Sequence, residues 1–188
     1  FGLQLTPFIK SPNFISNLEL NESFAHKHNW IRFLRETKDI TINKSNLIIK
    51  EVNDENFGNF CEILISAYET DPQAKKVMKG LIQSSKYINL LAYDNETPIA
   101  TASIFLDDEM AWFGFAATDI NHRNKGAQGV LIKHRLKLAK EHGCKFVTVE
   151  TMEDTIKKRN PSYHNMIRYR FVNCYKRKNY IYYPLTKK

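Results

Sequence analysis

The chain has 188 residues, 43% of them apolar, which is enough for one ordinary domain with a full core and too little for two. No run of eighteen apolar residues occurs and no signal segment opens the chain, so we expect a cytoplasmic protein without a membrane partner. Cys61, Cys144 and Cys174 lack CxxC spacing, which argues against disulfides and against a zinc site. We therefore expect packing roles for the cysteines and no metal.

The net charge of +8 comes from the C-terminal part of the chain. Residues 155–188 contain ten Lys and Arg and no Asp or Glu, whereas the first 154 residues hold 18 basic and 20 acidic side chains. A basic stretch of this kind can bind nucleic acid, membrane headgroups or an anionic cofactor. Apolar and aromatic residues interrupt it as in strands, and no nucleic-acid-binding motif is present, so we favour the cofactor over nucleic acid.

Residues 1–46 are predicted to form an N-terminal extension that packs on the main domain. Within it, the apolar residues Phe24, Ile31 and Phe33 form a ragged stripe that predicts a short helix over Ser23–Arg35.

A more regular pattern begins at Leu47. Leu47–Val52 predicts a strand, and Asn53 is a candidate cap for a helix that reaches Tyr68. Asp71-Pro72 predicts the start of a second helix, with Gly80 as its interruption or end.

Three strand candidates follow in succession. They are Tyr87–Tyr93, Ile99–Leu106 and Met110–Thr118, and the linkers between them are short and rich in turn residues. These linkers predict antiparallel hairpins. The third segment is apolar on both faces, which predicts a position in the centre of the sheet.

The remainder alternates helices and strands. The candidates are a helix over Gly129–His142 ended by Gly143, a strand over Lys145–Glu150 parallel to the preceding one, a helix over Asn160–Tyr169, and strands over Val172–Tyr175 and Asn179–Leu185. The predicted fold class is α/β (mixed α+β). Its sheet has about seven mostly antiparallel strands flanked by helices, in the order β-αα-βββ-α-β-α-ββ.

The segment 119–132 joins an apolar strand to a long helix through a basic, glycine-containing turn. Gly126 and Gly129 allow backbone amides to approach an anion closely, and Arg123 and Lys125 add positive charge at the helix start. A strand-to-helix turn also needs glycine for steric reasons about as often, so the turn alone leaves both roles open. The spacing fits neither the P-loop nor the dinucleotide fingerprint.

The spacing Arg123-x-x-Gly126-x-Gln128-Gly129, together with Asn160-Pro161-Ser162, resembles the GNAT family of acetyl-CoA-dependent N-acetyltransferases. The order of predicted elements is also the order of that fold. The resemblance implies an acetyltransferase domain over residues 47–188. It departs from the family pattern at Gln128, where a small residue is usual, although a glutamine keeps its own backbone amide.

The resemblance also implies three groups of residues that bind acetyl-CoA (CoA). They are the strand edge Ala116, Ala117 and Thr118, the turn residues Arg123, Asn124, Lys125, Gly126, Ala127, Gln128 and Gly129, and the helix residues Asn160, Ser162 and Asn165. For Asn160 and Ser162, ordinary helix capping is an equally good explanation.

The catalytic groups are less clearly marked. Family members often carry a tyrosine as general acid five residues before the phenylalanine of a Gly-Phe pair, and counting back from Phe171 places Met166 there, with Arg170 in place of the glycine. Glu150 and Asp119 are the candidate bases. Their structural alternatives are a solvated strand-end acid for Glu150 and a turn cap for Asp119.

The resemblance implies transfer of an acetyl group to a primary amine of a small-molecule or peptide acceptor. The alternative is a catalytically weak module that binds CoA, or nucleic acid through the C-terminal basic face. A homodimer is compatible with the sequence, and no signature identifies the acceptor.

Overall fold

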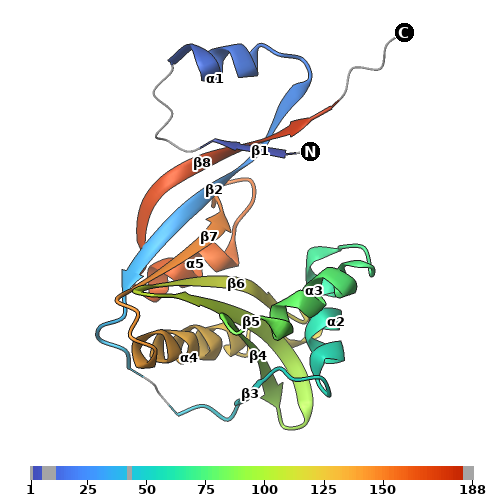
Figure 1. Cartoon of the computed structure of the whole chain (residues 1–188), viewed down its shortest axis with the longest axis vertical. Helices are drawn as coiled ribbons and strands as arrows, with labels where there is room; N and C mark the ends of the chain where they lie inside the picture. The colour runs from blue at the N-terminus through green and yellow to red at the C-terminus, as the bar shows by residue number, and fades with distance from the viewer. Residues whose placement is uncertain (1, 6–11, 42–43, 184–188) are drawn as a thin grey trace. The chain divides into compact units, whose positions relative to one another are not determined.

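The computed structural model describes residues 2–5, 12–41 and 44–183, and they form two compact units (Figure 1). The central unit comprises residues 35–149, and the terminal unit combines residues 1–34 with 150–188. Strand β7 (Phe146–Met152) runs through the boundary, because its first four residues belong to the central unit and its last three to the terminal unit. The boundary between residues 46 and 47 stays a sequence-based prediction.

The central unit contains strands in the order β3-β4-β5-β6-β7. Their bounds are β3 (Ile48–Glu51), β4 (Tyr87–Asp94), β5 (Thr97–Asp107) and β6 (Met110–Thr118), followed by the start of β7. β3 to β6 pair antiparallel, and β6 pairs with β7 in parallel. The predicted hairpins, the inner position of β6 and the parallel crossover are confirmed.

Helices cover both faces of this sheet. The helices are α2 (Phe57–Tyr68), α3 (Ala74–Gln83) and α4 (Ala127–Glu141). Leu91 and Tyr93 of β4 pack in the cluster formed by α2, whereas Leu90 and Ala92 pack in the cluster that contains α4. Since alternate residues of a strand point to opposite faces, α2 and α4 lie on opposite sides (Figure 1).

Two predicted helix starts are displaced by a few residues. The Asn53 side chain accepts hydrogen bonds from the amides of Glu55 and Asn56, so it holds the turn that precedes α2. Asp71 does the same before α3 by accepting from the amide of Gln73. Gly80 lies inside α3 and does not end it.

The terminal unit contains three strands and two helices besides the end of β7. They are β1 (Gly2–Leu5), α1 (Pro12–Glu19), β2 (Phe24–Glu36, up to Leu34 in this unit), α5 (Pro161–Arg168) and β8 (Val172–Tyr182). β8 lies between β1 and β2 and pairs antiparallel with both.

The helix predicted over Ser23–Arg35 is wrong, because this segment is strand β2. Its ladder with β8 is irregular near His26 and near Arg32, and each irregularity breaks the two-residue alternation of a regular strand. The apolar residues therefore imitated a helical spacing.

The two strands predicted at the C-terminal end are the single strand β8, and residues 184–188 lie outside the described part. With eight strands among the described residues, the mixed α/β class and the flanked sheet are confirmed. Cys61 and Cys144 are buried as expected, but Cys174 is exposed. No helix in the described ranges is long and apolar enough to cross a membrane.

Candidate functional site

Strand β6 is irregular in its second half. Phe115 has a left-handed backbone with φ of 46°, and the pairing with β5 shifts between Thr101 and Ser103, which is the geometry of a β-bulge. Within the described part of the central unit, β7 pairs with Met110–Phe113, and beyond them only Gly114, Ala117 and Thr118 of β6 have partners on β5. The predicted edge Ala116, Ala117 and Thr118 lies in this part of β6.

Side chains of the central unit hold the bulge in place from three directions. Thr101 Oγ1 donates to the carbonyl of Phe115 at 3.1 Å, and Tyr68 Oη donates to the carbonyl of Ala116 at 3.0 Å. Gln128 Nε2 donates to the carbonyl of Ala117 at 2.8 Å. These carbonyls are already engaged, so a ligand along this edge would use the remaining backbone groups.

The turn after β6 begins with Asp119. Its carboxylate accepts a hydrogen bond from the amide of Asn121 at 2.8 Å and caps the short helix η1 (Ile120–His122). The turn then passes through two left-handed residues, Asn124 with φ of 65° and Gly126 with φ of 79°. Asp119 therefore has the turn-capping contact; its role as a base stays a prediction.

The N-terminus of α4 is not capped by a side chain. The amide of Val130 makes the first intrahelical bond, to the carbonyl of Gly126, which leaves the amides of Ala127, Gln128 and Gly129 in the unpaired first turn. A Cβ added at Gly126 would meet no heavy atom within 4 Å, so space is open beside these donors. This arrangement fits an anion such as a pyrophosphate.

The side chain of Gln128 fixes this helix start against the sheet. Besides the carbonyl of Ala117, its Nε2 reaches the carbonyl of Thr101 and Oγ1 of Thr118, both at 3.2 Å. Ala127 is buried in the cluster with Leu131. The residue that departs from the family pattern thus ties the turn to β5 and β6, a role the sequence did not reveal.

The two basic side chains of the turn differ in their surroundings. Lys125 Nζ pairs with Asp94 Oδ2 at 2.8 Å, and the lysine holds the pKa of Asp94 below its usual value through this hydrogen bond and the charge itself. Arg123 is exposed and makes no ion pair with the residues that the structure describes. Arg123 is therefore the more available cation for a bound anion.

A buried arginine of α4 packs against β5 and β6. Arg135 of α4 is 1% exposed, and its Nη1 donates to the carbonyl of Ser103 at 3.1 Å. Its guanidinium lies 4.1 Å from the ring centroid of Phe113. Burial lowers the pKa of Arg135 to about 9, so the side chain remains a cation at neutral pH.

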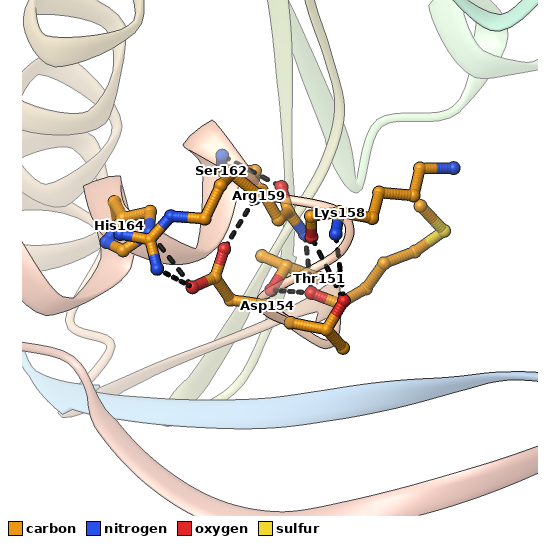
Figure 2. Close-up of polar contacts among 9 residues, drawn as sticks. Thr151, Asp154, Lys158, Arg159, Ser162 and His164 are labelled. Atoms are coloured by element: carbon orange, nitrogen blue, oxygen red, sulfur yellow. Dashed lines mark hydrogen bonds and ion pairs between the residues drawn. The ribbon is translucent and has the colours of Figure 1, made fainter.

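In the terminal unit, Asp154 organises the loop between β7 and α5 (Figure 2). Its carboxylate accepts from the amide of Asn160 at 2.6 Å and pairs with Arg159 Nη1 at 3.2 Å and His164 Nε2 at 3.1 Å. The backbone hydrogen bond from Asn160 is the main reason that the pKa of Asp154 is lowered. The loop is thus closed by its own polar groups.

Asn160 completes this closure as the cap of α5. Its Oδ1 accepts from the amide of Ser162 at 3.0 Å, and its Nδ2 donates to the carbonyl of Met152 at 2.5 Å. The Ser162 side chain is exposed, and the backbone carbonyl of Asn165 accepts from the amide of Tyr169. Asn160 therefore has the capping contacts; the cofactor-binding roles of Asn160, Ser162 and Asn165 stay predictions.

The position where the family often has a tyrosine is part of the protein interior. Met166 is 4% exposed, and the nearby Tyr163 packs its ring edge against Phe33, with centroids 5.2 Å apart. Arg170, in place of the family's glycine, has φ of 61°, which is the left-handed region that glycine occupies without strain.

Glu150 is held between two guanidinium groups in the terminal unit. Arg32 Nη2 lies 3.1 Å from its Oε1, and Arg177 Nη2 lies 2.8 Å from its Oε2. A role as base would require one of these pairs to open, so Glu150 as a base stays a prediction. Glu153 pairs with Lys176 of β8. Glu150 and Glu153 therefore each neutralise one basic side chain of β8.

The predicted site residues fall into both units. The β6 edge, Asp119 and the turn before α4 lie together in the central unit, and Glu150, Asn160, Ser162 and Asn165 lie in the terminal unit. The sequence missed Tyr68, Arg135 and the side-chain role of Gln128. Tyr68 ends one predicted helix, and Arg135 lies on another, the helix predicted over Gly129–His142. Neither helix pattern indicates which backbone atoms these two side chains contact.

Comparisons with known proteins agree with this geometry. The family model of the acetyltransferase (GNAT) family matches residues 53–160. The chain resembles a GCN5-related N-acetyltransferase from Sphaerobacter thermophilus (9% identity, TM-score 0.75, covering 95% of this chain and 58% of that one). It also resembles a GNAT acetyltransferase from Colwellia psychrerythraea (14% identity, TM-score 0.68, 97% and 64%).

A third similar structure is a GCN5-related N-acetyltransferase from Kribbella flavida (14% identity, TM-score 0.64, 88% and 62%). The chain therefore spans less than two thirds of the length of these three structures, and at these identities the likeness concerns the fold. No curated protein matches the sequence. Because the family model covers more than half of the sequence, the chain belongs to the GNAT acetyltransferase family.

Proposed function

We propose that this protein is an acetyl-CoA-dependent N-acetyltransferase that acts on a primary amine. One observation carries the proposal: the turn 119–126 leads from the bulged edge of β6 to the uncapped first turn of α4 in a chain of this family. The acceptor is proposed as a small-molecule amine or a peptide amine.

The residues of the central unit fit an acyl carrier with an anionic end. The amides of Ala127, Gln128 and Gly129 would donate to the pyrophosphate, with Arg123 adding charge. The edge formed by Ala116, Ala117 and Thr118 would hold the pantetheine arm through its free backbone groups. When bound, acetyl-CoA supplies an activated acetyl group as a thioester.

Group transfer needs two proton movements that the protein must assist. The acceptor nitrogen forms the new C–N bond and loses a proton, and the sulfur leaves with the electrons of the broken C–S bond. Glu150 and Asp119 are the proposed proton acceptors. Glu150 would first have to open one of its two ion pairs, whereas Asp119 accepts a hydrogen bond from the amide of Asn121 through one carboxylate oxygen.

Thermal unfolding with CoA tests the proposal directly. A ligand that binds only the folded state stabilises it by about 2.7 kcal/mol at a hundred times its dissociation constant, so CoA should raise Tm. Incubation with acetyl-CoA and a panel of amines, polyamines and peptides should then release free thiol.

Each outcome separates the alternatives. No Tm shift at millimolar CoA would overturn CoA binding altogether. A Tm shift without thiol release from any amine would favour the catalytically weak binding module.

A further inference from the structure

We propose that the hydroxyl group of Tyr68 donates the proton to the departing thiolate. This inference rests on the proposed acetyl transfer, and it assigns a catalytic role that the sequence pattern leaves empty at Met166.

Tyr68 is placed at the bulge of β6 by the end of α2. It is the last residue of that helix, and its hydroxyl lies 3.0 Å from the carbonyl oxygen of Ala116. The side chain is 51% exposed, so a ligand can reach it from solvent. A thioester arm along Ala116 and Ala117 would therefore pass beside a phenol.

The hydroxyl of Tyr68 carries its proton at neutral pH, because burial raises its pKa above the ordinary value of 10.0. The charge of the buried Arg135 acts against this shift, because a cation favours the phenolate and so lowers the pKa of Tyr68, but burial is the larger effect. The hydrogen bonds of Arg135 go to the carbonyls of Leu131 and Ser103.

The proton balance closes over one turnover. The C–S bond breaks, its electron pair goes to sulfur, and the Tyr68 proton converts the thiolate to a thiol. The proton released by the acceptor nitrogen, carried by the base or by water, then restores the phenol. No oxidant, reductant or further reactant is required.

The test compares Tyr68→Phe with the matched control Tyr93→Phe, which removes a hydroxyl from the core cluster that α2 forms with β4. Tyr68→Phe should lower kcat about a hundredfold, the lower end of the range for losing a positioned proton donor, while the CoA-induced Tm shift is kept. The KM for acetyl-CoA should stay unchanged in Tyr68→Phe, because the proposed donor acts on the leaving sulfur and not on binding. Tyr93→Phe should keep kcat, KM and the CoA-induced Tm shift.

The outcomes distinguish this role from the proposed function itself. An inactive wild type would overturn acetyl transfer and the role of Tyr68 with it. An active wild type with unchanged kcat in Tyr68→Phe would overturn only the proton donor. If Tyr68→Phe loses both the CoA-induced Tm shift and turnover, Tyr68 holds the bulge in place, and its role as proton donor is overturned.

Discussion

The family resemblance assigns the starts of helices α4 and α5 to the cofactor, but the backbone amides of their first turns differ. Those of α4 have no side-chain cap, whereas the start of α5 is capped by Asn160. At α4, Gly126 takes the capping position and contributes no side chain, so the amides of the first turn stay available. At α5, Asn160 fills the capping position with its own Oδ1, and Asp154 binds the amide of Asn160.

This contrast shows how two similar sequence signals lead to different chemistry. A helix start binds an external anion only when no internal acceptor has taken its amides. The glycine of α4 leaves that place open, whereas the asparagine of α5 closes it and stabilises the loop. We therefore expect the cofactor's phosphates at α4 and a mainly structural role for the start of α5.

The largest effect is expected when the open helix start is filled. Gly126→Asp places a side chain and a negative charge beside the free amides, so the CoA-induced Tm shift should disappear. Gly143→Asp is the matched control, because Gly143 has nearly the same backbone with φ of 80° and equally open surroundings at the other end of α4. The control should lose stability but keep the shift; a shift retained in Gly126→Asp would place the phosphates elsewhere.

The next largest effect concerns the carboxylate proposed as a base. Glu150→Gln removes the negative charge between Arg32 and Arg177, which are only partly exposed. The free energy of unfolding should therefore fall by about 2 kcal/mol. Chemical denaturation measures this change, and turnover at a temperature where both proteins are folded measures the base role separately. Unchanged stability with a hundredfold lower turnover would make Glu150 the base and contradict the structural role.

A smaller loss is expected when the closed helix start is opened. Asn160→Ala removes both the cap of α5 and the hydrogen bond to Met152, which should cost about 1–2 kcal/mol of unfolding free energy. Ser162→Ala, which keeps the capped amide, should change it by less than about 0.5 kcal/mol. If Asn160→Ala instead leaves stability intact and abolishes the CoA shift, Asn160 binds the cofactor.

The smallest effect is a pH dependence. Asp154 has a folded-state pKa below its ordinary value of 3.8, so its contribution to stability is present above about pH 4 and is lost as pH falls through the lowered pKa. Melts of the wild type and Asp154→Asn between pH 7 and pH 3 should therefore converge toward the acidic end. Parallel curves would show that Asp154 does not stabilise the loop through its charge.

The sequence by itself determined the elements whose signals are local. The hairpins of β4, β5 and β6, the helix α4 with its glycines at both ends, and the basic turn follow from alternation, turn residues and helix periodicity within short windows. The same locality allowed an anion site to be predicted at Gly126, because a glycine before a helix is a pattern of neighbouring residues, and the left-handed backbone of Gly126 fits that prediction.

Only the tertiary structure decided features that join distant segments. The β2 segment imitated a helix because its bulges are visible only against β8, and Glu150 gained its two arginines from β2 and β8. Tyr68 reaches the carbonyl of Ala116 in β6 from the end of α2, and Arg135 reaches the carbonyl of Ser103 in β5 from α4. Such contacts depend on strand register and helix packing, which spacing along one chain does not encode.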